Sequence, residues 1–140
     1  MSGAQRMHVA AGILTDASGR GLIGERLGDS PFAGLWEFPG GKIHDDETPD
    51  AALRRELREE LDIEVTECEH FMQLMHEYAD RSVALEFFKV LGWQRQPRSC
   101  DGQALAWRNP LEISAAELLP ANAVVLRALQ GESAPAGRQS

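Results

Sequence analysis

The chain contains few cysteines, few basic residues and no long apolar stretch. Its two cysteines, Cys68 and Cys100, are isolated, so they fit neither the paired spacing of a zinc site nor a disulfide framework. The longest apolar run near the N-terminus, residues 9–14, is too short to cross a membrane and lacks the layout of a signal peptide. We therefore expect a cytoplasmic protein in a reducing compartment, with no membrane partner.

Basic residues are outnumbered, because 14 Lys and Arg stand against 22 Asp and Glu, for a formal net charge of −8. Proteins that bind polynucleotides usually carry a basic face, so this balance argues against a polynucleotide partner. It does not exclude a single nucleotide as substrate, since bound metal ions can reverse the local electrostatics.

The 140 residues, 43% of them hydrophobic, are typical of one globular domain with a buried core. We expect a flexible start over residues 1–6, a folded domain over residues 7–130 and a disordered tail over residues 131–140. The pattern predicts strands at residues 7–14, 21–26, 35–38, 67–78, 82–93 and 104–108, and helices at residues 49–61 and from about residue 121. Hairpins combined with a helical crossover indicate an α/β protein with a mixed β-sheet.

The helix over residues 49–61 carries three glutamates beside an apolar face. Three leucines spaced by four residues form that face, and Glu56, Glu59 and Glu60 lie next to it within an arc of about 100°. The carboxylates repel one another, and the leucines strengthen the repulsion by excluding water. A hard divalent cation, Mg²⁺ or Mn²⁺, bound together with a phosphate-bearing substrate, would compensate. The alternative is a solvated surface helix whose glutamates pair with its own arginines.

The loop before this helix favours the metal interpretation. Gly40 and Gly41 allow the backbone to turn sharply and to approach a ligand, so that one of their carbonyls could join the carboxylates. Lys42 could add a cation for phosphate, although the alternative is a lysine that simply faces solvent.

The residues quoted so far carry a recognisable motif. Gly41, Glu47, the segment REL-x-EE over residues 55–60 and Ile63 resemble the Nudix box in identity and spacing. One position departs, because the box normally has glycine where this chain has Asp62; that glycine serves a helix-ending turn, which Asp can enter at some steric cost.

The resemblance implies a Nudix fold, an α/β/α sandwich, and hydrolysis of a nucleoside diphosphate linked to another moiety, assisted by Mg²⁺ or Mn²⁺. By the same resemblance Glu56, Glu59, Glu60 and the Gly40 carbonyl hold the metal. Arg55 and Glu47 are implied to orient the box, with Gly41 in a structural role.

Segments outside the box resemble the MutT-type 8-oxo-dGTP diphosphatases, namely residues 9–14 (VAAGIL), 35–42 (LWEFPGGK) and 118–122 (LLPAN). This resemblance implies that 8-oxo-dGTP is hydrolysed to 8-oxo-dGMP and pyrophosphate. It gives Asp101 the role of a further metal ligand or base, and Asn122 that of reading the purine edge. Taken alone, Asp101 would be a turn residue and Asn122 a helix N-cap.

Three further residues are candidates for the nucleotide site: Phe38 for the base pocket, and Arg26 and Arg81 for the nucleotide itself. The alternative for each of them is a place in the hydrophobic core or on the solvent-exposed surface. Among the catalytic candidates Glu56 is the first choice as general base, with Asp101 and Glu59 as reserves.

Other functions stay open at this point. A Nudix enzyme could act on CTP, another nucleoside triphosphate or ADP-ribose, and a Nudix-derived module could bind nucleotides without catalysis. We expect a monomer or a homodimer.

Overall fold

The computed structural model describes residues 5–28, 32–79 and 81–132. Within these ranges the chain forms seven strands, two short 3₁₀ helices and two α-helices. In chain order they are β1 (Gln5–Leu14), β2 (Gly21–Glu25), β3 (Trp36–Glu37), β4 (Gly40–Lys42), α1 (Pro49–Leu61), β5 (Glu64–Glu77), β6 (Arg81–Gln94), β7 (Leu105–Arg108), η1 (Pro110–Glu112), η2 (Ala115–Glu117) and α2 (Pro120–Glu132).

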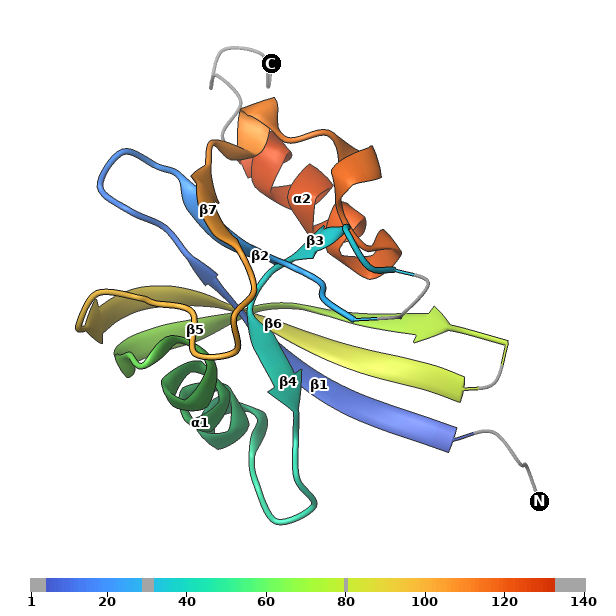
Figure 1. Ribbon diagram of the computed structural model, residues 1–140. Coiled ribbons are helices and arrows are strands. Elements are labelled where there is room, and N and C mark those ends of the chain that lie inside the picture. The colour runs from blue at the N-terminus through green and yellow to red at the C-terminus, as the bar shows by residue number, and fades with distance from the viewer. Residues whose placement is uncertain (1–4, 29–31, 80, 133–140) are drawn as a thin grey trace.

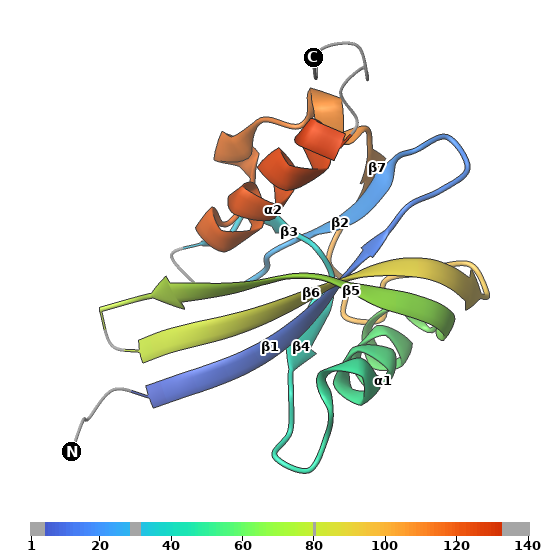
Figure 2. The same cartoon turned by 180° about the vertical axis from the view of Figure 1, so that it is seen from behind.

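Two sheets form the centre of the molecule. The larger has the order β4-β1-β6-β5, in which β1 and β6 run parallel and the outer pairs antiparallel, so it is a mixed sheet as the sequence predicts. The smaller is antiparallel, with the order β3-β2-β7. Figures 1 and 2 show α1 on one face of the larger sheet and α2 on the other. The expected α/β/α sandwich is confirmed.

Apolar side chains on both faces of the larger sheet form two separate hydrophobic cores. On one face, Ala10 and Val90 pack with the fully buried leucines of α1. On the opposite face, Ala11 and Phe87 pack with Val125 and its neighbours on α2. Because successive side chains of a strand point to opposite faces, β1 and β6 each contribute to both cores.

α1 spans the predicted residues 49–61, since its start carries strong signals. The Thr48 hydroxyl accepts a hydrogen bond from the Ala51 amide at 3.1 Å, and Pro49 occupies the first turn. At the other end Asp62 adopts a left-handed conformation with φ 59° and ends the helix. The helix-ending turn expected at this position is therefore confirmed.

Several boundaries differ from the prediction. β1 begins at Gln5, inside the segment expected to be flexible, because pairing with β6 continues to that residue. α2 continues through Glu132, two residues into the expected tail, and Lys89 on β6 forms an ion pair with Glu132 at 2.6 Å. The rest of that tail, residues 133–140, lies outside the described residues.

Strand β4 was missed, because its two glycines were interpreted as a stop. Their lack of a side chain is what allows the strand to form: a Cβ at Gly40 would overlap the Ala10 carbonyl of the neighbouring β1.

A buried carboxylate joins three strands of the larger sheet, β1, β5 and β6. Glu86 on β6 has only 8% of its side chain exposed and accepts hydrogen bonds from His8 at 3.1 Å, His70 at 2.7 Å and the Gln73 amide. Burial would raise the pKa of Glu86, but the hydrogen bonds from Gln73, His8 and His70 together lower it.

Glu86→Gln is therefore expected to lower the free energy of unfolding by about 1–3 kcal/mol at pH 7. A carboxylate whose folded-state pKa is lowered stabilises the fold above its unfolded pKa and loses that contribution as the pH falls through the folded value. Urea unfolding at pH 7 and pH 3.5 measures this, and the difference between the two proteins should be smaller at the lower pH. An equal difference at both pH values would contradict the assignment.

No helix among the described residues is long and apolar enough to span a membrane. Cys68 and Cys100 are both free.

Candidate active site

The three glutamates of α1 differ in their surroundings. Glu59 is exposed over 62% of its side chain, whereas Glu56 is exposed over only 18%. Glu60 is partly buried and lines a cavity beside the helix. The helix thus presents two of its three carboxylates toward the protein. The alternative interpretation, a surface helix whose glutamates all face solvent, does not explain this arrangement.

Arg55 ties this helix to the loop that precedes it. Its guanidinium donates to both oxygens of Glu47, at 2.6 and 2.9 Å, and to the Lys42 carbonyl at 2.9 Å. The remaining nitrogen donates to Glu56 at 3.0 Å and to Glu59 at 3.3 Å. The hydrogen bonds from Arg55 are the main cause that lowers the pKa of Glu47 to about 2. This planar, two-pronged contact fixes the loop relative to the glutamates.

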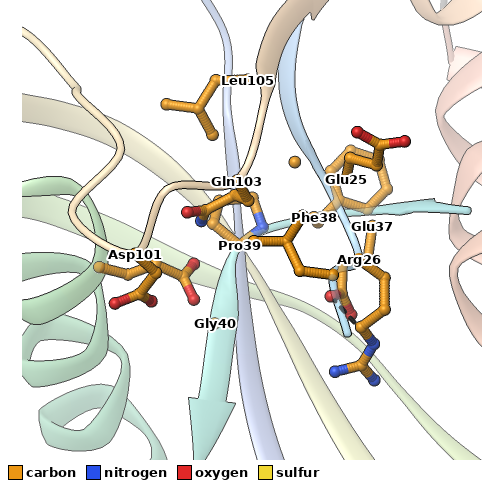
Figure 3. A pocket seen from close by; sticks show the side chains of 12 residues that line it. Glu25, Arg26, Glu37, Phe38, Pro39, Gly40, Asp101, Gln103 and Leu105 are labelled. Carbon is orange, nitrogen blue, oxygen red and sulfur yellow. Dashed lines mark ion pairs between the residues drawn. The ribbon is translucent and has the colours of Figure 1, made fainter. Parts of the chain in front are cut away.

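Next to Glu60 lies a cavity of about 220 Å³. Asp101, in the loop between β6 and β7, approaches it from the α1 side, and Gly40 of β4 borders it between the two helical layers (Figure 3). Arg26 and Glu37 lie at its other end and form an ion pair at 3.5 Å. The cavity therefore collects backbone and carboxylate oxygens from α1, β4 and the β6–β7 loop.

Negative charge accumulates at this cavity. The pKa of Glu60 is raised to about 8, first by burial and then by the neighbouring carboxylates of Glu37, Glu56 and Asp101. A hydrogen bond from the Gly40 amide acts in the opposite direction and lowers it. Burial also raises the pKa of Glu37, and the positive charge of Arg26 offsets only part of this increase. A bound cation would relieve this repulsion and allow Glu60 to ionise.

The donor set fits a hard divalent cation. Glu56, Glu60, Asp101 and the Gly40 carbonyl offer only oxygen, the donor that Mg²⁺ and Mn²⁺ prefer. A Cβ at Gly41 would overlap the Glu56 carboxylate, so this glycine allows the carboxylate to approach the backbone. Among the residues that the structure describes, no three His, Cys, Asp or Glu side chains already converge in a coordination geometry.

A second cavity, of about 110 Å³, adjoins the first. Arg26 and Glu37 line both, so this ion pair forms part of the wall of each cavity. Asn122 lies in the second cavity, only 5% exposed, and its Oδ1 accepts a hydrogen bond from the Phe38 amide at 2.9 Å. α2 begins at Pro120, so Asn122 lies within its first turn and not at its N-cap. Its side chain accepts from Phe38, which follows β3, and not from an amide of its own helix. The N-cap alternative is therefore wrong.

Arg81 also reaches the second cavity. Its guanidinium carbon lies 5.4 Å from the centre of the Tyr78 ring, and both residues line the cavity wall. The Arg81 Nε is buried and has no hydrogen-bond partner within the described part of the chain. A buried donor without a partner is uncommon and is compatible with a site that a ligand completes.

The NUDIX domain matches residues 5–137 of this sequence. The chain belongs to the Nudix family. An 8-oxo-dGTP diphosphatase of Proteus vulgaris is 42% identical over 92 residues, which cover 66% of this chain and 82% of the relative. A CTP pyrophosphohydrolase of Escherichia coli is 38% identical over 122 residues, 87% of this chain and 90% of the relative. The solution structure of the E. coli ORF135 protein has a TM-score of 0.82 and 36% identity, covering 95% of this chain and 96% of that one.

In this Nudix chain the structure brings together most residues that the sequence predicted. Glu60, Asp101, Gly40 and Arg26 line the first cavity, and Asn122 and Arg81 line the second. Phe38 lines the first cavity too, although it is mostly a core residue, with an edge-to-face contact to Phe87.

Three residues predicted to bind metal or substrate line neither cavity, namely Glu56, Glu59 and Lys42. Glu56 and Glu59 instead accept hydrogen bonds from Arg55, and the Lys42 side chain is exposed while its carbonyl accepts from Arg55.

Sequence reasoning missed Glu37, Tyr78 and Gln103. Glu37 belongs to the quoted LWEFPGGK segment, so that segment could have pointed to it. Gln103 lies two residues after Asp101, so the segment that pointed to Asp101 could have pointed to it as well. Tyr78 carried no signal, because it reaches its cavity through a hairpin whose path depends on the whole sheet.

Proposed function

We propose that this Nudix protein is a nucleoside triphosphate pyrophosphohydrolase that uses Mg²⁺ or Mn²⁺ and that its principal substrate is 8-oxo-dGTP. The observation that carries this proposal is that two neighbouring cavities share Arg26 and Glu37 in their walls: an oxygen-rich cavity suited to metal and phosphates adjoins a largely apolar cavity in which the Asn122 amide is suited to a base. Hydrolysis would remove oxidised guanine nucleotides from the cytoplasmic pool before a polymerase uses them.

At the phosphate end, Glu56, Glu59, Glu60, Asp101 and the Gly40 carbonyl would hold the metal. When bound, the metal neutralises phosphate charge and lowers the pKa of a water ligand. Glu56 is our first choice as general base, because it is partly buried and its carboxylate is oriented by Arg55. Water attack at the β-phosphorus breaks the bond to the α-phosphate and yields the nucleoside monophosphate and pyrophosphate.

At the base end, Asn122 offers a defined set of hydrogen bonds. Its Oδ1 has one lone pair engaged by the Phe38 amide, which leaves a second lone pair and the two Nδ2 donors for a ligand. 8-Oxoguanine carries an N–H at position 7 where guanine carries an acceptor, so the free lone pair of Oδ1 favours the oxidised base. Arg81 Nε adds a further donor in the same cavity.

Asn122→Ala is expected to lower the preference for 8-oxo-dGTP over dGTP by about 10²-fold or more, because a site built to pair a polar edge loses selectivity when the partner is removed. Steady-state kcat/KM on both nucleotides measures the ratio. Asn122→Asp is the matched variant, since it retains an acceptor for the Phe38 amide while it removes the Nδ2 donors. Equal losses on both nucleotides in both variants would mean that Asn122 only supports the fold.

A second candidate substrate is CTP. It is favoured by the E. coli relative named for CTP, which matches this chain over most of both lengths. A pyrimidine also presents a carbonyl to the Asn122 Nδ2 donors, but it has no N–H that corresponds to position 7 of 8-oxoguanine.

Pyrophosphate release with Mg²⁺ from 8-oxo-dGTP, dGTP, dCTP and CTP, with AMP release from ADP-ribose beside it, tests the proposal. We expect kcat/KM to favour 8-oxo-dGTP over dGTP by several orders of magnitude. A maximum on CTP or ADP-ribose would retain the hydrolytic site and overturn the substrate. No turnover on any of them would favour a nucleotide-binding module without catalysis.

A further inference from the structure

The loop that carries Asp101 is attached to the C-terminal end of α1, the helix that carries the three glutamates. The Arg98 amide donates to the Leu61 carbonyl and the Cys100 amide to the Glu60 carbonyl, each at 3.0 Å. These carbonyls belong to the last turn of the helix, where C=O groups lack partners within the helix itself. Asp101 follows Cys100 directly, so the attachment delivers its carboxylate to the cavity that Glu60 lines.

Side chains add a second attachment at Asp62. One oxygen of its carboxylate accepts from Arg95 Nη1 and the other from Arg98 Nε, both at 3.1 Å. Asp62 therefore holds two arginines of the loop that leads to Asp101. The arginines are 63% and 72% exposed, so the ion pairs lie at the surface, outside the cavity.

The backbone at this junction is unusual. Asp62 has φ 59° and Arg95 has φ 78°, and these are the only non-glycine residues with positive φ in the ranges that the structure describes. Residues with a side chain adopt this conformation at a cost. The two strained residues are joined to each other by an ion pair, which indicates that the junction has a role beyond ending a helix.

The Asp62 carboxylate is also a feature of this particular chain, because the Nudix box has glycine at this position. Glycine would adopt the required φ without strain but could not bind either arginine. The substitution therefore exchanges an unstrained turn for two contacts to the Asp101 loop.

We propose that Asp62 is a positioning residue, which holds the 95–101 loop against α1 and so fixes Asp101 beside Glu60 at the metal end of the site. The inference rests on the proposed function. It concerns the placement of a metal ligand and not the chemistry of hydrolysis.

Asp62→Asn tests the inference, since asparagine tolerates the left-handed conformation but removes the charge that binds the arginines. We expect the Kd of the substrate-free protein for Mn²⁺, measured by electron paramagnetic resonance, to rise about three- to tenfold, the range that two exposed ion pairs can supply. At saturating metal, the KM for nucleotide should stay near the wild-type value.

The matched control is Glu64→Gln, which removes an exposed ion pair to Arg58 (3.5 Å) at the same end of α1 without touching the loop. Its Mn²⁺ affinity should equal that of the wild type. In an Asp101→Asn background, Asp62→Asn should add no further loss of affinity, because the loop then no longer presents the carboxylate that Asp62 positions.

The same loss in both backgrounds, or a lower Tm with unchanged Mn²⁺ affinity, would show that Asp62 is merely structural. If the wild type binds Mn²⁺ and hydrolyses nucleotide while Asp62→Asn binds Mn²⁺ equally well, this inference alone fails. If the wild type does neither, the proposed function fails and the inference falls with it.

Discussion

Glu56→Gln is expected to lower kcat by about 10²- to 10⁴-fold, the range that a positioned general base contributes. The amide has nearly the same shape, and its oxygen can still accept the hydrogen bond that Arg55 donates at 3.0 Å. What is lost is the negative charge that holds a cation and the basic oxygen that takes a proton from water. The fold should be preserved, so Tm should change by only a few degrees.

Steady-state pyrophosphate release and thermal unfolding of the same preparations measure both quantities. Glu64→Gln serves as the control, because this exposed carboxylate follows α1 and pairs with Arg58, whereas Glu56 pairs with Arg55 beside the other glutamates. Wild-type turnover by Glu56→Gln would refute its assignment as base or metal ligand. A large loss of Tm would instead identify Glu56 as a structural partner of Arg55.

Glu60→Gln is expected to have opposite effects on stability and on activity. Burial, aided by Glu37, Glu56 and Asp101, raises the pKa of Glu60 from the ordinary 4.5 to about 8. Because the folded state binds this proton more tightly than the unfolded chain, the metal-free protein loses stability as the pH rises from about 4.5 to about 8. The variant escapes that loss, since glutamine does not ionise.

In the presence of EDTA, Glu60→Gln should unfold at the wild-type temperature at pH 4.5. At pH 9 it should be more stable by about 2–4 kcal/mol, which corresponds to about 7–14 °C. Activity with Mg²⁺ should fall by orders of magnitude at every pH. Glu59→Gln is the matched control, because its carboxylate is 62% exposed and its removal should change Tm little at either pH. A Tm difference that does not grow with pH would contradict the account of Glu60.

The phosphate end of the site was largely predictable because its residues, Asp101 excepted, are close in sequence. Helical periodicity alone places Glu56, Glu59 and Glu60 beside the leucine stripe, and local signals at Thr48 and Pro49 fix where the helix starts. The Arg55–Glu47 pair, eight residues apart, was implied by the resemblance to the Nudix box, and the structure shows it. Asp62 was predicted to end the helix with a left-handed turn, and it does.

The base end and the Asp62 contacts depend on residues that are far apart in sequence. Asn122 and Phe38 are 84 residues apart, and Asp62 and Arg98 are 36 apart. These pairs meet only because β1 and β6 run parallel at the centre of the larger sheet and set the paths of the connecting loops. Strand β4 was missed for a related reason: its glycines indicate a turn locally, and only pairing with β1 makes them a strand.

Hydrolysis of 8-oxo-dGTP in ¹⁸O-labelled water, with Mg²⁺ and with EDTA, tests the central claim most directly. Our account predicts turnover with Mg²⁺ only, with one ¹⁸O atom in pyrophosphate and none in 8-oxo-dGMP, because water attacks the β-phosphorus. Label in the nucleotide, release of orthophosphate, or equal turnover in EDTA would contradict it.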